Sequence, residues 1–232
     1  MARRPASGCG RDQHSKFTPY KLASTDDTDA RLPATIIILA GGRSVRMGGR
    51  HKALLPWAGG TLLGHIVTQG RAAAREVLVV GGDGLEVPAP ALSISDIFPG
   101  KGPLGGLHAG LSAASFERCV AVGCDMPFVS ARILRALLDL GAGYGAAVPQ
   151  AADGLHPLLA AYSRRCLPAI EERLRSDDRR LVSFLDQVRV RWVAEDELRA
   201  FDPELQCLVN INTWADYRRA LAMSRTPAPT SD

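Results

Sequence analysis

The chain has 232 residues, of which 46% are hydrophobic and 22% are charged, close to the average of globular proteins. This balance excludes a disordered chain, and no apolar run approaches the roughly 20 residues that a membrane-spanning helix needs. The net charge of +4 comes with arginines spread along the chain, which argues against nucleic acid as a partner and suits an anionic small molecule.

The two ends of the chain lack hydrophobic periodicity. We expect residues 1–33 to form a flexible extension and residues 224–232 a flexible tail, with one domain at 34–223 between them. No apolar segment of a secretory signal follows the basic residues near the N-terminus, and the five cysteines are scattered without a CxxC pair. These features predict a cytoplasmic protein without a disulfide framework.

Between the ends, apolar runs of strand length alternate with stretches of helical spacing, which is typical of a mostly parallel sheet covered by helices. The predicted strands are 34–40, 76–81, 91–96, 118–125, 144–149, 155–162 and 188–193. The predicted helices are 61–75, 104–115, 130–140, 165–175, 179–187 and 213–223, with Ser130 and Thr213 as N-caps. The pattern indicates a single-domain, three-layer, Rossmann-like α/β fold with its ligand site at the carboxyl edge of the strands.

A loop rich in glycine and arginine, LAGGRSVRMGGRHK (39–52), follows the first predicted strand. Its glycines allow sharp turns that present backbone N–H groups to an anion, and its cations supply positive charge. They are Gly41, Gly42, Gly48 and Gly49, and Arg43, Arg46, Arg50 and Lys52. Because Ala53 follows Lys52, the loop is not a Walker A sequence, so we expect phosphate binding outside the P-loop class.

A GxGxxG pattern, formed by Gly100, Gly102 and Gly105, lies between a predicted strand and a predicted helix, and Asp125 follows 20 residues later. The pattern matches the dinucleotide fingerprint, so a dinucleotide-dependent oxidoreductase stays open as an alternative. However, Pro103 removes a backbone donor from the turn. We therefore favour a rigid turn that places Asp96 at a strand end and packs the next helix through its glycines.

Asp125 ends the apolar strand of CVAVGCDMPF (119–128). A carboxylate at the carboxyl end of a central strand, opposite a cationic glycine loop, is typical of sites that hold Mg²⁺ on nucleotide phosphates. We expect Asp96 to end a neighbouring strand in the same way. Strand alternation turns Cys124 to the opposite face, where it is a core residue rather than a nucleophile.

Five segments, in this order, resemble the nucleotidyltransferases of molybdenum cofactor biosynthesis, and among them the molybdenum cofactor guanylyltransferase family. They are LAGGRSVRMGGRHK, DIFPGKGPLGGLHAGL, VGCDMPF, LHPLLAAY and LVNINTWADY, and together they span about residues 33–223. The first is the most specific, since LAGGxxxRMGGxxK combines several spaced identities.

The resemblance implies a nucleotidyltransferase fold and Mg²⁺-dependent transfer of GMP from GTP to the phosphate of molybdopterin, with release of pyrophosphate. It assigns GTP binding to Leu39, Ala40, Gly41, Gly42, Lys52, Asp96 and Asp125. It assigns catalysis to Arg46, Lys52 and Asp125, the metal to Asp125, and pterin binding to Asn210 and Asn212. Lys52 and Arg46 would take up the charge that develops on pyrophosphate.

The partners that the resemblance implies are GTP, molybdopterin or its molybdenum-loaded form, and molybdenum-insertion proteins of the same pathway. We expect a monomer that binds neither nucleic acid nor a membrane.

Two positions bear on the choice of nucleotide. The family commonly has an Asn after the second strand, where VVGGDG places Gly82 or Asp83, which removes one base or ribose contact. Related cytidylyltransferases typically read LAAG where this chain reads LAGG, so Gly41 favours guanine and a CTP-dependent enzyme is the alternative. A non-catalytic nucleotide-binding regulator is the other alternative, against which the intact Lys52 and Asp125 argue.

Overall fold

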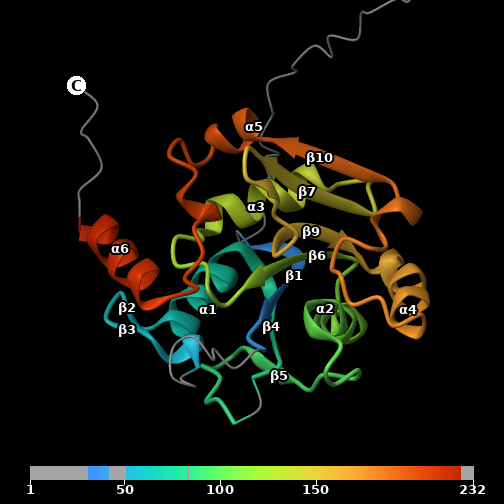
Figure 1. Ribbon diagram of the computed structural model, residues 1–232, viewed down its shortest axis with the longest axis horizontal. Coiled ribbons are helices and arrows are strands. Elements are labelled where there is room, and N and C mark those ends of the chain that lie inside the picture. The colour runs from blue at the N-terminus through green and yellow to red at the C-terminus, as the bar shows by residue number, and fades with distance from the viewer. Residues whose placement is uncertain (1–30, 42–50, 83, 226–232) are drawn as a thin grey trace, which may run out of the picture. The chain divides into compact units, whose positions relative to one another are not determined.

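A mostly parallel sheet runs through the part of the chain that the computed structural model describes, residues 31–41, 51–82 and 84–225 (Figure 1). Its strands are β1 (Leu32–Leu39), β4 (Ala74–Val80), β5 (Leu92–Ile94), β6 (Arg118–Gly123), β7 (Ala146–Ala151), β8 (Gly154–Leu155), β9 (Leu159–Ser163) and β10 (Val190–Ala194). Their order is β10-β7-β9-β6-β1-β4-β5, with β8 paired to β7. Strand β9 runs antiparallel to β6 and β7, and β8 antiparallel to β7, whereas the other pairs are parallel. The predicted sheet is confirmed.

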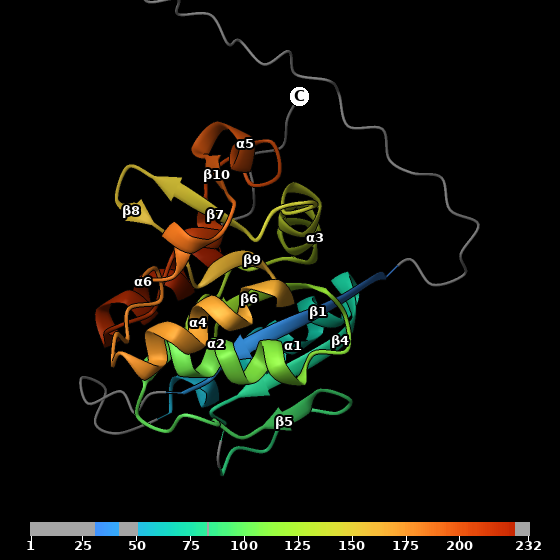
Figure 2. The same cartoon turned by 90° about the vertical axis from the view of Figure 1, so that its right-hand side faces the viewer.

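Helices cover both faces of the sheet and give the predicted three layers (Figures 1 and 2). They are α1 (Leu62–Ala73), α2 (Gly102–Ala113), α3 (Ala131–Leu140), α4 (Leu167–Arg175), α5 (Glu195–Arg199) and α6 (Trp214–Arg225). Helix α1 packs against α3 on one face, and α2 packs against α4 on the other. Within the described ranges, no helix combines the length and apolar character needed to cross a membrane.

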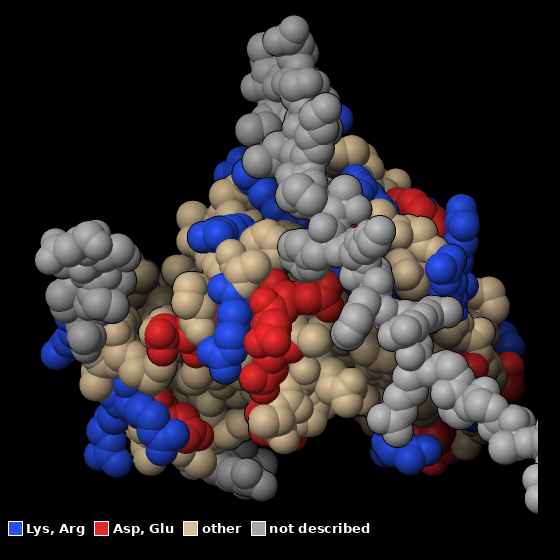
Figure 3. Space-filling view, turned by 90° about the horizontal axis from the view of Figure 1, so that it is seen from above, with Lys and Arg blue, Asp and Glu red and all other residues tan. Residues whose placement is uncertain are grey.

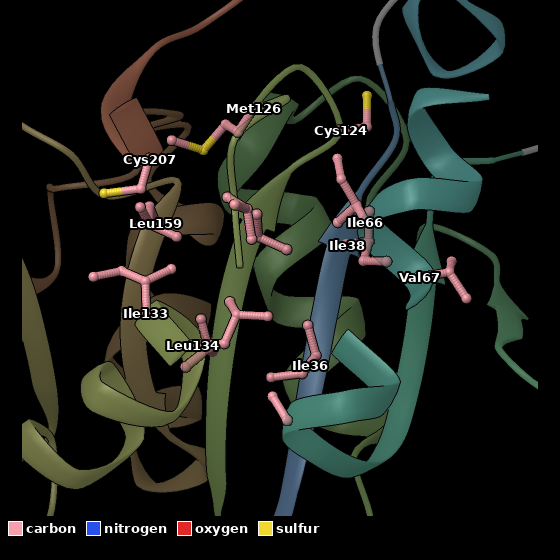
Figure 4. Close-up of a cluster of buried hydrophobic side chains, with 14 of the residues drawn as sticks. Ile36, Ile38, Ile66, Val67, Cys124, Met126, Ile133, Leu134, Leu159 and Cys207 are labelled. Carbon is pink, nitrogen blue, oxygen red and sulfur yellow. The ribbon is translucent and has the colours of Figure 1, made fainter. Parts of the chain in front are cut away.

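The core lies in two clusters, one on each side of the sheet, because alternate residues of β1 point to opposite faces. Ile36 and Ile38 face the cluster under α1 and α3, which Figure 4 shows with Ile66 and Ile133. Ile37 faces the cluster under α2 and α4. Each of these isoleucines is fully buried, and burying such a side chain contributes about 1.5–3 kcal/mol.

Glycines bring α2 close to the sheet, as the sequence predicts. A Cβ at Gly110 would overlap Cγ2 of Ile37. Before the helix, Gly100 and Gly102 adopt φ of +79° and +65°, which side chains other than glycine rarely allow. A Cβ at Gly105 would lie 3.0 Å from the Phe98 carbonyl oxygen, so each glycine of the GxGxxG pattern has a conformational or packing reason that requires no dinucleotide.

Both predicted N-caps are confirmed. Ser130 caps α3 by accepting from the Ile133 N–H, and Oγ1 of Thr213 accepts from the Asp216 N–H at the start of α6. Strand β1 begins at Leu32, two residues earlier than expected.

The helix predicted at 179–187 is wrong, because this segment forms turns followed by the 3₁₀ helix η4 (Leu185–Gln187). Its helical spacing came from Leu181, Phe184 and Leu185, which are buried beside α4 but are too few to nucleate a helix.

The single strand predicted at 155–162 is also wrong, since it divides into β8 and β9 around Pro157, which has no N–H for the ladder. The hairpin of β2 (Pro56–Trp57) and β3 (Gly60–Thr61) and helix α5 were not expected.

Charges of both signs lie side by side on the face seen in Figure 3, which looks down on α5 from above Figure 1. Around this helix, Arg199 pairs with Glu195 at 3.3 Å and Arg191 pairs with Glu197 at 2.6 Å. Surface pairs of this kind contribute about 0–1 kcal/mol each. On this face, acidic and basic side chains are therefore mixed.

Candidate active site

The candidate site lies where the chain order of the sheet reverses. From β1 the chain continues to β4 and β5 on one side, and then returns to place β6 on the other side of β1. In open α/β sheets, ligands bind beyond the carboxyl ends of the strands at such a switch point. Here the Cys124 N–H donates to the Leu39 carbonyl (3.1 Å), which ties the chain beyond β6 to the end of β1.

Asp125 presents its carboxylate at this edge because both of its neighbours are held in the core. Cys124 and Met126 are 7% and 1% exposed (Figure 4). Gly123 makes room for the carboxylate, since a Cβ there would lie 2.6 Å from Oδ1 of Asp125. Burial, together with the charge of Asp125, raises the pKa of the Cys124 thiol to about 12. Cys124 is thus the predicted core residue, protonated at neutral pH and unsuited to nucleophilic attack.

Lys52 joins two of the predicted residues. It begins the 3₁₀ helix η2 (Lys52–Leu54), and its side chain is 16% exposed. Its Nζ lies 3.2 Å from Oδ2 of Asp125 and 2.8 Å from Oδ1 of Asn212. Three residues that are far apart in sequence therefore form one cluster, which we call the lysine cluster: Lys52, Asp125 and Asn212.

The segment before α6 is fastened to the same place. The Ile211 N–H donates to the Asp125 carbonyl (2.8 Å). Oδ2 of Asp216 accepts from the N–H groups of Asn212 (3.1 Å) and Thr213 (2.9 Å) and from Oγ1 of Thr213 (2.9 Å). The hydrogen bond from the Thr213 hydroxyl holds the pKa of Asp216 below its ordinary value. Sequence reasoning missed Asp216, although the Thr-x-x-Asp spacing of a capping box marks it.

Asp96 and Asn210 lie outside the lysine cluster in the described hydrogen bonds. The expectation that Asp96 ends a strand neighbouring that of Asp125 is wrong, because β4 and β1 lie between β5 and β6. Oδ1 of Asp96 accepts from the Phe98 N–H (2.9 Å), which stabilises the turn before α2. Nδ2 of Asn210 donates to the Leu208 carbonyl (3.3 Å).

The LAGG segment is described as far as Gly41. Leu39 and Ala40 are 9% and 2% exposed, and the Ala40 N–H donates to the Val80 carbonyl (2.9 Å). The Leu39 carbonyl and the Ala40 N–H thus bond within the protein, whereas Gly41 is exposed. The predicted Gly42 and Arg46 lie outside the described residues, as do Arg43, Gly48, Gly49, Arg50 and Asp83.

Gly81, after β4, is a second residue that sequence reasoning missed. It adopts φ of +73°, and a Cβ there would lie 2.9 Å from Cα of Gly41. Glycine at 81 therefore lets the ends of β1 and β4 approach each other. The Gly-Gly pair directly after a buried strand is the signal that marks it. The adjacent Gly82, where the family commonly has an Asn, is buried.

Carboxylates are few at this edge. In ranges 31–41, 51–82 and 84–225, no three His, Cys, Asp or Glu side chains converge as a set of metal ligands. Asp125 is the carboxylate of the lysine cluster, so a metal here would need further oxygen ligands from a substrate or from water.

One protein family and several known proteins are similar to this chain in sequence. The family described as MobA-like NTP transferase domain matches residues 36–192. A probable molybdenum cofactor guanylyltransferase from Pelotomaculum thermopropionicum is 38% identical over 196 residues, covering 83% of this chain and 94% of the relative. The molybdenum cofactor guanylyltransferase of Desulfosudis oleivorans is 34% identical over 190 residues, with 81% and 94% covered.

A solved structure is similar over the same part of the chain. Molybdopterin-guanine dinucleotide biosynthesis protein A from Archaeoglobus fulgidus superimposes with a TM-score of 0.73 at 29% identity, covering 83% of this chain and 100% of that one. The family match covers residues 36–192, and each of the two relatives aligns with this chain over 94% of its own length. The chain belongs to the molybdenum cofactor guanylyltransferase family of MobA-like nucleotidyltransferases.

Proposed function

We propose that this enzyme transfers GMP from GTP to the terminal phosphate of molybdopterin, or of its molybdenum-loaded form, and releases pyrophosphate. The names of the relatives support the reaction class, and the resemblance of the five sequence segments supports the substrates. The observation that carries the proposal is the lysine cluster, which places an ammonium and a carboxylate together at the switch point.

In the proposed reaction, an oxygen of the pterin phosphate attacks the α-phosphorus of GTP. A new P–O bond forms, the bond to the oxygen that bridges the α- and β-phosphorus breaks, and its electron pair leaves with pyrophosphate. Such chemistry needs positioning and charge neutralisation more than a covalent group on the enzyme. Lys52 has three N–H donors and two acceptors in the described residues, so one donor can bond a phosphate oxygen. We expect Arg46 to add a second cation there.

Asp125 fits a Mg²⁺ that is shared with the nucleotide. Magnesium is commonly held by one or two carboxylates, with phosphate oxygens and water completing its shell, and Asp125 supplies one partly exposed carboxylate at the edge where we place the phosphates. Bound there, the ion would neutralise phosphate charge. Asp125 would hold it, while Lys52 keeps a positive charge beside the same phosphates.

Gly41 is our candidate for base selection because the described residues around it leave room for a side chain. Among the described residues, a Cβ at this position would have Gly81 Cα as its nearest neighbour, at 3.8 Å, an ordinary van der Waals distance. Gly41 is exposed, beside the buried end of β1. A methyl group there would narrow the space available to a ligand without a clash with the described residues, as expected for a position that separates purine from pyrimidine.

The test is pyrophosphate release with Mg²⁺ and molybdopterin, comparing GTP, CTP, ATP and UTP. We expect release with GTP alone. Release with CTP instead would overturn the choice of base and identify a cytidylyltransferase, and no release with any nucleotide would favour the regulator.

Gly41→Ala tests the base-selecting residue. We expect kcat/KM for GTP to fall by about tenfold relative to that for CTP, the discrimination typical of one methyl group. Gly60→Ala is the matched control, since Gly60 is exposed in β3 and a Cβ there lies 4.0 Å from its nearest neighbour. An unchanged ratio in Gly41→Ala would contradict the assignment.

A further inference from the structure

A closed ring of contacts links Asp125, Lys52 and the segment before α6. Starting from the carboxylate of Asp125, it passes through Nζ of Lys52 to Oδ1 of Asn212. It returns along the backbone to Ile211, whose N–H donates to the carbonyl of the same Asp125. Asn212 thus contacts the group that we place on the nucleotide phosphates.

The chemistry of the ring fixes the orientation of the Asn212 amide. A lysine ammonium only donates hydrogen bonds, so the oxygen of the amide must face it and the NH₂ group must face away. The backbone of Asn212 is itself held, because its N–H donates to Oδ2 of Asp216 at the start of α6. The oxygen is therefore presented to Lys52 by a rigid support.

A second tie holds α6 to the Lys52 segment. The hydroxyl of Tyr217 donates to the carbonyl of Pro56 in β2, four residues after Lys52 (2.7 Å). This tie and the bond from Ile211 to Asp125 do not involve the Asn212 side chain. Removing that side chain should therefore leave the segment docked and release only the ammonium.

We propose that Asn212 is a positioning residue for the nucleotide, acting through Lys52. A lysine side chain loses conformational entropy when it is ordered. Asn212 and Asp125 together order it before the nucleotide arrives, so less of this cost falls on binding. The proposal rests on the proposed function, and it gives Asn212 a role besides the pterin binding that the resemblance implies.

The test measures GTP affinity by equilibrium binding without molybdopterin, so that a contact with the pterin cannot contribute. We expect Asn212→Ala to weaken GTP binding by about fivefold, the scale of one hydrogen bond. Gln206→Ala is the matched control, because Gln206 carries the same amide group in η5 (Gln206–Leu208), just before this segment, and is not a member of the lysine cluster, so its GTP affinity should match that of the wild type. Equal GTP affinity in wild type and Asn212→Ala would overturn the proposal.

A double-mutant cycle with Lys52→Ala tests whether Asn212 acts through the lysine. In the Lys52→Ala background, we expect Asn212→Ala to change GTP affinity by less than about twofold, because the group that it positions is gone. A full fivefold loss in that background would contradict the mechanism. In steady state, Asn212→Ala should raise KM for GTP, and a change confined to KM for molybdopterin would also contradict it.

The binding measurements on wild type and Asn212→Ala also separate this inference from the proposed function. If the wild type binds CTP and not GTP, the choice of base fails, and the same comparison is made with CTP. If the wild type binds GTP and the Asn212→Ala variant binds it equally well, the positioning role alone fails. Thermal unfolding of each variant shows whether it remains folded.

Discussion

At the amino edge of the sheet, a carboxylate uses both of its oxygens within its own chain, whereas at the carboxyl edge a lysine has more donors than its neighbours accept. At the amino edge, Oε2 of Glu76 accepts from Oγ1 of Thr35 (2.5 Å) and from the Ser115 N–H (2.8 Å). Oε1 accepts from the Ser115 hydroxyl (2.6 Å). This cluster joins β1, β4 and the chain before β6, and both oxygens of its carboxylate have hydrogen-bond donors within the protein.

The lysine cluster at the carboxyl edge is of the other kind. Lys52 bonds two acceptors with three N–H groups, and the NH₂ group of Asn212 faces away from the lysine. Its members are held in place by Ile211 and Asp216 but have bonding capacity left for a ligand. A polar cluster whose hydrogen-bonding groups all have partners within the protein stabilises the fold. A cluster that is held in place but has unused N–H donors can also bind a ligand.

The largest effect should follow from Asp125→Asn. Oδ1 of an asparagine can still accept from Lys52, so the fold should keep its stability within about 0.5 kcal/mol. The charge is lost, however, and we expect turnover to fall by about 1,000-fold, the scale of removing one electrostatic contact to a transition state. Pyrophosphate release and thermal unfolding measure the two quantities. Near-normal turnover would contradict the metal-holding role of Asp125.

Glu76→Gln should show the opposite result. A glutamine places one NH₂ group where the carboxylate accepted from Thr35 or Ser115, so a donor then faces a donor. We expect the free energy of unfolding to fall by about 1–3 kcal/mol, with kcat unchanged. Urea unfolding measures this loss. The control is Glu86→Gln, because Glu86 is an exposed glutamate in the loop that follows β4. Equal stability of the two variants would show that the Glu76 cluster is not stabilising.

The sequence alone predicts most of the lysine cluster at the carboxyl edge. Strand alternation predicts that Cys124 turns to the core, as it does, although β6 ends at Gly123, two residues before Asp125. The resemblance of the motifs names Lys52 and Asn212 as well, and the structure brings all three together.

Other features depend on contacts between distant elements. Asp96 lies two residues beyond the end of β5 at Ile94, and strand order is set by packing, which places β4 and β1 between β5 and β6. Leu181 and Phe184 show helical spacing, yet they lie in a turn and are buried in the same core cluster as Ile170 of α4. The Glu76 cluster escaped notice because its partners, Thr35 and Ser115, lie about 40 residues away on either side and meet it only in the folded sheet.

The smallest effect that we expect is in the pH dependence of stability, and it concerns Glu76 at the amino edge. Burial alone would raise the pKa of Glu76, but the hydrogen bonds from Ser115 and Thr35 outweigh it and hold the pKa below its ordinary value of 4.5. The folded protein therefore keeps this carboxylate charged at a pH where the unfolded chain begins to protonate it. The stabilisation is fully present well above pH 4.5 and is lost as the pH falls through the lowered value.

We therefore expect the difference in unfolding free energy between wild type and Glu76→Gln to be constant at neutral and mildly acidic pH and to shrink at lower pH. Glutamine does not titrate, so the part that shrinks belongs to the ionisation of Glu76. Urea unfolding at a series of pH values measures it, with Glu86→Gln again as the control. A difference that stays constant down to the acid transition would mean that the hydrogen bonds of Glu76 do not depend on its charge, and the amino-edge cluster would then be stabilised by packing instead.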